Sequence, residues 1–267
     1  MPRTIVLLTD FGLRDAYVGQ MKGVIHTHAP GAGIVDLCHQ VEPFNILQAG
    51  FFLAASHPHF PGGAVFVSVV DPGVGGDRRI VLLEKHGQFF LAPDNGLLTF
   101  LLQQSGPSLS RDVTPARSGD ASATFHGRDI FAPLAARLAG DTPSTQFGEE
   151  CELKSLVRLP GAEPMPTPEG VSATVLHVDR FGNCLLNLEN EAWGGRIFQC
   201  QRLAITVSAS PPRSLCPAYT YERLERGQLG VIKGSQGFLE LAMNRKSAAA
   251  ELNLTPGGAV SVRLDRS

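Results

Sequence analysis

This sequence predicts an α/β domain followed by an all-β domain, and three observations support that prediction. From residue 4 to about 140, short apolar runs alternate with helical stretches, which is typical of a largely parallel sheet flanked by helices. Five prolines between Gly140 and Gly170 mark a connector with little regular structure. Beyond it, short β runs separated by Gly and Asn turns favour a small barrel-like domain. We therefore place an α/β domain at 1–140, a Pro-rich connector at 141–169 and a β-barrel-like domain at 170–267.

The individual elements follow from run length and residue type. Short runs rich in β-branched residues are expected as strands, whereas longer periodic stretches are expected as helices. In the first domain these are strands at 4–8, 33–37 and 64–70, a hairpin of 80–84 with 88–91, and helices at 16–29, 45–55, 97–104 and 131–139. In the second domain they are strands at 171–178, 184–188, 202–207, 229–232, 238–242 and 260–264.

The composition excludes several classes of protein. With 43% apolar and 18% charged residues, the 267-residue chain can bury a substantial core and is not disordered. A net charge of −2 gives no basic surface for nucleic acid. No apolar run is long enough to span a membrane, and the N-terminus lacks a signal-peptide pattern, so we expect a cytoplasmic protein.

Metal and disulfide chemistry is also disfavoured. The five cysteines are scattered without a Cys-x-x-Cys spacing, which argues against a disulfide framework or a zinc site. The His-x-His pairs at 26/28 and 57/59 have no nearby carboxylate or cysteine partner. We therefore expect neither a metal nor a cofactor.

Two predicted strands end at an aspartate. Asp71 follows the apolar run 64–70 and opens a Gly-rich segment that leads to Arg78, whereas Asp10 follows the run 4–8. Ligands of open α/β sheets bind just beyond the carboxyl ends of the strands, so the two carboxylates suggest one site with two acidic contacts. An ordinary Pro-Gly turn with solvated charges explains Asp71 equally well when that segment is taken alone.

Other polar residues lie in predicted loops and turns. His126 lies in a predicted loop before a helix, and functional side chains concentrate in loops, although each such residue taken separately is better explained by capping or solubility. Phosphate-binding, dinucleotide-binding and nucleophile-elbow motifs are absent from the sequence, and the Asp-Phe-Gly string lacks the upstream elements of a kinase. Residue chemistry alone indicates a two-domain α/β enzyme or binding protein.

Taken in order, the segments resemble the S-adenosyl-L-methionine (SAM) hydroxide adenosyltransferases, a family related to the fluorinase and the chlorinase. The resemblance implies an N-terminal α/β domain, a C-terminal β-barrel, and a homotrimer whose sites lie between the N-terminal domain of one subunit and the C-terminal domain of its neighbour. It rests on motifs spread over nearly the whole chain: Thr9–Gly12, Asp15–Gly23, Val69–Gly76, Ala92–Leu98, Thr124–Asp129, Asp179–Asn183 and Gly234–Asn244.

The resemblance implies that SAM is hydrolysed to adenosine and L-methionine. Water or hydroxide would attack C5′ of the ribose and displace the neutral thioether of methionine. The catalytic trio would be Asp71, Arg78 and His126, in which Arg78 stabilises negative charge on the oxygen. Asp71 and His126 would orient the oxygen and handle its proton, and the sequence does not assign the proton to either. No metal or cofactor is implied.

Substrate contacts are implied on both domains. In the first domain, Asp10 would bind the ribose diol, and Asp15 and Tyr17 would lie beside the methionine end. In the second domain, Asp179 would contact the methionine ammonium, Asn183 the adenine edge and Ser235 the methionine carboxylate. The remaining implied contacts supply aromatic surface or adenine-facing backbone: Phe181, Tyr221, Met243, Asn244 and Arg245.

Two alternatives stay open. A halide-using adenosyltransferase is disfavoured because Asp71 and His126 stand where the halide pocket would be, and a carboxylate there would repel fluoride or chloride. The short turn at 85–87 also leaves no room for the fluorinase's extra loop, while Gln236 replaces a fluorinase arginine near the methionine carboxylate. A protein that binds adenosine or SAM without turnover is disfavoured by the trio, which mere binding does not need.

Overall fold

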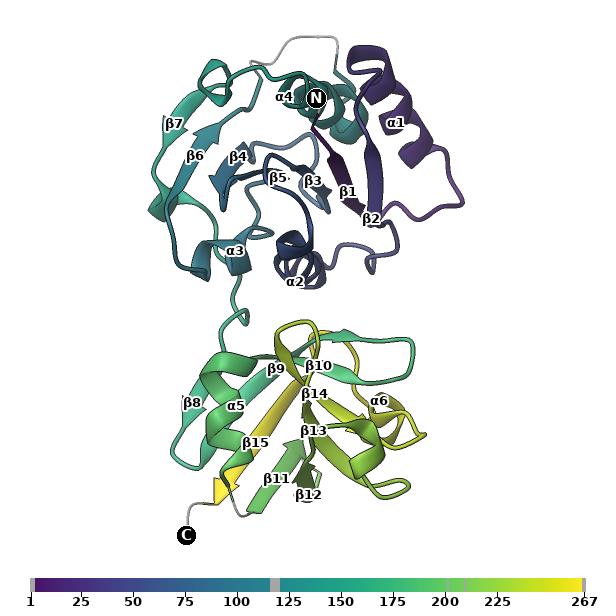
Figure 1. The fold of residues 1–267 in the computed structure, drawn as a ribbon, viewed down its shortest axis with the longest axis vertical. Coiled ribbons are helices and arrows are strands. Elements are labelled where there is room, and N and C mark those ends of the chain that lie inside the picture. The colour runs from purple at the N-terminus through teal and green to yellow at the C-terminus, as the bar shows by residue number, and fades with distance from the viewer. Residues whose placement is uncertain (1–2, 116–120, 201, 209, 266–267) are drawn as a thin grey trace. The chain divides into compact units, whose positions relative to one another are not determined.

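The computed structural model describes residues 3–115, 121–200, 202–208 and 210–265. The chain divides into two compact units, Met1–Leu159 and Pro160–Ser267, here termed the N-terminal and C-terminal units (Figure 1). Within the described part of the chain, no helix combines the length and the apolar character needed to cross a bilayer.

A seven-stranded mixed sheet forms the centre of the N-terminal unit, in the order β2-β1-β3-β5-β4-β6-β7. The pairs β1–β2, β1–β3 and β3–β5 are parallel, whereas β4–β5, β4–β6 and β6–β7 are antiparallel. Only β4 and β7 therefore run against the others, and the prediction of a largely parallel sheet is confirmed. The strands are β1 (Ile5–Thr9), β2 (Ile34–Cys38), β3 (Val65–Val69), β4 (Ile80–Lys85), β5 (Gln88–Pro93), β6 (Ser108–Asp112) and β7 (Glu149–Cys151).

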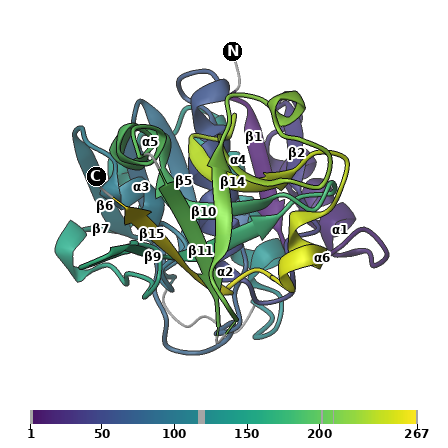
Figure 2. The ribbon, with the colours of Figure 1, turned by 90° about the horizontal axis from the view of Figure 1, so that it is seen from below.

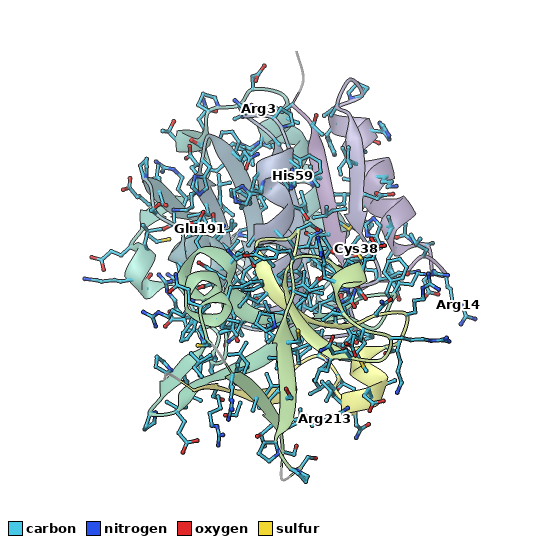
Figure 3. All side chains as sticks on the ribbon, turned by 60° about the horizontal axis from the view of Figure 1, so that its bottom comes forward. Arg3, Arg14, Cys38, His59, Glu191 and Arg213 are labelled. Atoms are coloured by element: carbon cyan, nitrogen blue, oxygen red, sulfur yellow. The ribbon has the colours of Figure 1, made fainter. Side chains whose placement is uncertain are left out.

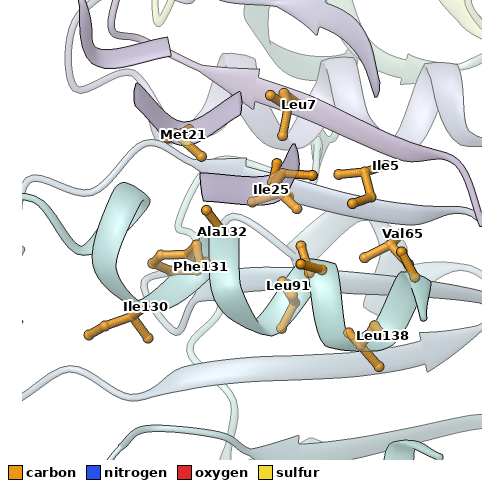
Figure 4. Close-up of a cluster of buried hydrophobic side chains, with 14 of the residues drawn as sticks. Ile5, Leu7, Met21, Ile25, Val65, Leu91, Ile130, Phe131, Ala132 and Leu138 are labelled. Atoms are coloured by element: carbon orange, nitrogen blue, oxygen red, sulfur yellow. The ribbon is translucent and has the colours of Figure 1, made fainter. Parts of the chain in front are cut away.

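Helices cover both faces of this sheet. Helix α1 packs against α4 over one face, where side chains of β1 and β3 such as Leu7 and Val65 meet Met21 and Phe131 in one buried cluster (Figure 4). Burial on both faces explains why β1 and β3 are apolar except for Thr9 and Ser68. The helices are α1 (Tyr17–His28), α2 (Ile46–Ser56), η1 (His57–His59), α3 (Thr99–Gln103), the π-helix η2 (Gly127–Phe131), α4 (Ala132–Ala139), η3 (Ser144–Gln146) and η4 (Leu153–Ser155).

The C-terminal unit is a closed β-barrel, of which β9, β10, β11, β14 and β15 are labelled in Figure 2, and β12 and β13 in Figure 1. Seven strands follow one another in the order β10-β14-β13-β12-β11-β15-β9, and pairing of β9 with β10 closes the ring. The barrel-like prediction is confirmed. Its elements are β8 (Met165–Thr167), β9 (Gly170–Val178), β10 (Cys184–Glu189), α5 (Asn190–Phe198), β11 (Arg202–Val207), β12 (Arg213–Pro217), η5 (Tyr221–Arg223), β13 (Leu229–Lys233), β14 (Phe238–Met243), α6 (Ala248–Leu252) and β15 (Ala259–Asp265).

The structure differs from the prediction over residues 141–169, which were expected as a Pro-rich connector. This stretch contributes β7 to the first sheet and β8 to the second, and the division between the units falls inside it, after Leu159. Strand β8 tolerates Pro166 because β8 lies at the end of its sheet and pairs with β9 alone. Pro166 therefore lies in an edge strand, whereas the sequence interpretation took the prolines of this stretch as a sign that it has little regular structure.

Candidate active site

Asp10 and Asp71 lie at the same edge of the first sheet. Asp10 directly follows β1, and Asp71 comes two residues after β3, which pairs with β1 in parallel and in the register Thr9 to Val69. Neighbouring parallel strands end at the same edge of a sheet, so the two strands that Asp10 and Asp71 follow are adjacent there. The two aspartates therefore lie at one edge of the sheet, and their shared role in a site stays a prediction.

Three side chains from separate segments converge beside this edge. The Arg78 guanidinium donates from Nε to both Asp71 oxygens, at 3.0 and 2.9 Å, and from Nη2 to Asp71 Oδ2. The same Nη2 lies 2.8 Å from Nδ1 of His126. The side chains of Asp71 and Arg78 are only 4% and 11% exposed. The structure therefore brings Asp71, Arg78 and His126 together, and we call them the trio.

The contact with Arg78 fixes the protonation of His126. A guanidinium has donors only, so Nδ1 must accept the hydrogen bond with its lone pair. The neutral ring then carries its proton on Nε2, where it can donate to a ligand. Burial lowers the pKa of His126, and the adjacent charge of Arg78 lowers it further, against the opposing effect of Asp71 and Asp129. His126 is therefore a neutral hydrogen-bond donor at neutral pH.

Two glycines allow the segments that carry the trio to approach one another. Gly75 has φ of +79°, and a Cβ there would lie 2.4 Å from the carbonyl oxygen of Ala123. A Cβ on Gly127 would lie 3.2 Å from Phe11, Phe125 and Met21. Gly127 also opens the π-helix that follows His126, a feature frequent at functional sites.

A cavity of about 680 Å³ lies against the trio, and we call it the front cavity. Asp10, Asp71 and His126 line it, together with the rings of Phe11, Tyr17 and Phe125, whose centroids are 5.1 to 5.9 Å apart. Its size lies within the usual range for small-molecule sites, roughly 300–1,000 Å³. The combination of aromatic wall and carboxylates suits a ligand with an apolar body and hydroxyl groups.

Of the other site residues predicted in this unit, Asp10 and Tyr17 line the front cavity and Asp15 does not. Asp10 accepts a hydrogen bond at Oδ2 from the backbone N–H of Phe44, at 2.9 Å, which orients its carboxylate. Tyr17 begins α1 and is half-exposed. Asp15 is exposed and is not among the described residues that line the front cavity, so its role stays a prediction.

Arg128 lines the front cavity, and its charge is balanced by an ion pair with Asp129. Its guanidinium donates to both oxygens of Asp129, at 2.6 and 2.9 Å, and to Oε1 of Gln20 at 2.9 Å. Hydrogen bonding from Arg128 lowers the pKa of Asp129. The Arg128–Asp129 pair therefore stiffens the segment after His126 and adds no net charge to the site.

Arg79, the neighbour of Arg78, makes structural contacts outside the trio. Its guanidinium donates to Asp94 Oδ2, at 2.9 and 2.6 Å, and to the carbonyl oxygen of Ser155 at 2.7 Å. Asn95 Nδ2 donates to the carbonyl oxygen of Val70 at 2.9 Å, which secures the chain just before Asp71. The motif Ala92–Leu98 is thus a structural support for the end of β3.

On the C-terminal unit, Asp179 organises the turn that carries its neighbours. Its Oδ1 accepts hydrogen bonds from the backbone N–H groups of Phe181 and Asn183, both at 2.8 Å. Its Oδ2 accepts from Asn183 Nδ2 at 2.9 Å, while the Phe181 ring is 79% exposed. Asp179 is thus a turn residue in the structure, and the ligand contacts implied for these three residues stay predictions.

A cavity of about 480 Å³ on this unit is lined by three predicted site residues, Tyr221, Asn244 and Arg245. The Tyr221 hydroxyl donates to Glu240, a 5%-exposed carboxylate in the middle of β14. Burial, together with the charge of Asp179, raises the pKa of Glu240. The sequence interpretation missed Glu240, although a carboxylate inside the apolar run of β14 was an available signal.

The last two predicted residues differ in exposure. Ser235 is exposed in the turn between β13 and β14. The Met243 side chain is buried in the barrel core, so that only its backbone remains for a ligand. A ligand role for either residue stays a prediction.

No cluster of His, Cys, Asp or Glu suited to a metal ion occurs among the described residues. The five cysteines, including Cys38 in Figure 3, are free thiols. His57 is buried and contacts Gln88 and Gln104 at 3.0 and 3.1 Å through its two ring nitrogens. It therefore belongs to a structural polar cluster.

Comparison with known proteins identifies relatives over the whole chain. The SAM hydroxide adenosyltransferase N-terminal domain matches residues 5–148, and the corresponding C-terminal domain matches residues 173–261. A curated (R)-S-adenosyl-L-methionine hydrolase of Thermus thermophilus is 37% identical, over 96% of this chain and 97% of its own. A fluorinase of Actinopolyspora mzabensis is 30% identical, over 98% and 97% of the two chains. A crystal structure of an uncharacterised conserved protein from Thermotoga maritima superposes with a TM-score of 0.87 at 34% identity, over 97% and 99%.

The lowered pKa of His126 predicts an acid limit to activity. Protonation at Nδ1 competes with the hydrogen bond from Arg78, so turnover should be full well above pH 6.5 and fall as the pH drops through a midpoint below that value. Steady-state rates measured from pH 4.5 to 8 will locate the midpoint. His126→Asn offers an amide oxygen to Arg78 without titrating, so it should be slower and lack this limb. An unchanged limb in that variant would assign the titration to another group.

Proposed function

The chain belongs to the SAM hydroxide adenosyltransferase family, and we propose that it hydrolyses SAM to adenosine and L-methionine. The observation that carries this proposal is the convergence of Asp71, Arg78 and His126, of which Asp71 and His126 line the front cavity. The family resemblance supplies the substrate, and the geometry of the trio supports the choice of water as nucleophile.

The proposed step is a nucleophilic substitution at C5′ of the ribose. The water oxygen forms a bond to C5′ while the C5′–S bond breaks, and the electron pair of that bond goes to sulfur as the neutral thioether of methionine. One proton of the water is released in each turnover. Because sulfonium is a good leaving group, the protein has to supply alignment and exclusion of bulk water, and the step needs no metal or cofactor.

The roles within the trio follow from its hydrogen bonds. Arg78 faces the attacking oxygen and stabilises the hydroxide-like negative charge that builds up as the water gives its proton to Asp71. The position of Arg78 is fixed by two-point contact with Asp71. His126 offers Nε2–H to orient the water, because its Nδ1 is held by Arg78. Among the described residues, Asp71 Oδ1 accepts from Arg78 Nε alone and keeps a lone pair, so we assign to Asp71 the acceptance of the proton.

The substrate contacts are assigned by the same resemblance. We propose that Asp10 binds the ribose diol, with the aromatic wall of Phe11, Tyr17 and Phe125 beside the substrate. On the C-terminal unit, Asp179 would contact the methionine ammonium and Ser235 the methionine carboxylate. Asn183 and the backbone of residues 243–245 would contact adenine. Tyr221 and Phe181 would supply aromatic surface around the substrate.

We propose that the protein is a cytoplasmic homotrimer in which each site combines N-terminal residues of one subunit with C-terminal residues of its neighbour. In support, the proposed contacts fall into two groups, one on each unit, and each group has a cavity of its own. Large apolar side chains such as Phe44 and Phe181, 71% and 79% exposed, suit burial in an interface. Light scattering of the purified protein should then give three times the 28.5 kDa chain mass, and a monomer in solution would rule out shared sites.

Isotope labelling tests the reaction itself. Purified protein incubated with SAM in oxygen-18 water, with and without chloride, should give adenosine labelled at its 5′ oxygen and methionine, with no effect of chloride. Chromatography and mass spectrometry of the products measure both. A 5′-chloro product would favour the halide reaction, and intact SAM beside stoichiometrically bound adenosine would favour a binding protein.

Adjacent arginines provide a matched pair of variants. Arg78→Ala should lower kcat by about 10²–10³-fold with a much smaller change in KM, because Arg78 acts on charge that develops during the reaction. Arg79→Ala should lower the melting temperature through loss of its contacts with Asp94 and Ser155, while the folded enzyme keeps its kcat. Normal turnover in Arg78→Ala would remove the main support of the proposed mechanism.

A further inference from the structure

A second cavity, of about 370 Å³, lies against the same trio, and we call it the rear cavity. Arg78 and His126 line it, together with small residues that include Gly76, Ala121 and Ala123. Of the described residues that line the two cavities, His126 alone lines both. The trio is thus divided: Asp71 lines the front cavity, Arg78 lines the rear cavity, and His126 lines both.

The wall between the cavities is formed by two short chain segments. In the segment 121–124, Ala121 and Ala123 line the rear cavity, while Ser122 and Thr124 line the front cavity. The segment after Asp71 is divided in the same way, with Val74 at the front and Gly75 at the rear. We call these two segments and the trio the partition, because neighbouring residues within it line different cavities.

The rear cavity has the polar groups that water requires. Nε and Nη2 of Arg78 are bonded to Asp71 and His126, whereas the two N–H groups of Nη1 make no hydrogen bond to any described residue. Asp77 and Thr114 add polar groups to the lining. A water molecule occupies about 30 Å³ in the liquid and is held by two to four polar partners, so the cavity can take several. Ala123, on its wall, is exposed, which places solvent at the outer side.

We propose that the rear cavity supplies the water that attacks C5′ while the substrate fills the front cavity. This rests on the proposed function. An in-line displacement puts the nucleophile on the side of C5′ opposite to sulfur, which is the side of the trio. A substrate seated in the front cavity covers that entrance, yet each turnover consumes one water. The Nη1 donors of Arg78 draw the water to the partition, and Asp71 and His126 align it on the other side.

Substitutions that fill either cavity test this division. At Ala123, a series of Val, Leu and Phe should lower kcat progressively, by about tenfold or more for the largest, with KM for SAM within about twofold of wild type. Ala121→Leu should act in the same way. Thr124→Leu, one residue away but at the front, should instead raise KM. Calorimetry with adenosine and thermal melting of each variant establish that the front site and the fold are intact.

The outcomes separate this proposal from the proposed function. If the wild-type protein releases no labelled adenosine, the proposed function fails. If it does, and the Ala123 series keeps full kcat while remaining folded, water reaches the trio through the front cavity and the rear-cavity proposal fails alone. A rise in KM along the Ala123 series, matching that of Thr124→Leu, would likewise overturn it, because the rear cavity would then hold part of the substrate.

Discussion

The two-point ion pair between Asp71 and Arg78 is the interaction on which the rest of the site depends. Both side chains are largely withdrawn from water, and neither charge is tolerable there without the other. Because the pair leaves the guanidinium a single orientation, Nη2 meets His126 and selects its tautomer. The Gly75 turn and the Asn95 contact to Val70 serve this pair, since both hold the chain from which Asp71 projects.

The position of the two aspartates at one sheet edge could be predicted from the sequence, whereas the grouping of the trio could not be predicted from the residue pattern. Strand ends can be recognised from apolar runs, so the shared edge of Asp10 and Asp71 was predictable from topology alone. Nothing in the residue pattern distinguishes Arg78 from Arg79, which are adjacent and chemically identical, yet only Arg78 meets Asp71. His126 joins them across 48 residues, a contact that depends on tertiary structure. The family resemblance therefore identified the trio, and the geometry assigned its hydrogen bonds.

Several elements that the sequence interpretation missed lack a long apolar run, the signal by which the other elements were recognised. Strands β6 and β7 lie towards the end of the sheet, where apolar runs are not required, and β8 contains a proline that only an edge strand accommodates. Helix α5 contains Gly194 and Gly195, and glycine is a poor helix former, so the sequence did not indicate this helix. Glu240 lies inside the otherwise apolar strand β14, and its carboxylate there was a signal that the sequence interpretation did not use.

The charge of the trio explains why water suits this site better than a halide. Asp71 and Arg78 cancel, and His126 is neutral while Arg78 holds its Nδ1, so the trio presents no net positive charge. An anion that entered would lose its hydration without gaining an unopposed cation, which is unfavourable in a partly buried site. Water enters as a neutral molecule at little cost. Its oxygen gains negative charge only as Asp71 takes the proton, and Arg78 stabilises that charge until the bond to C5′ has formed.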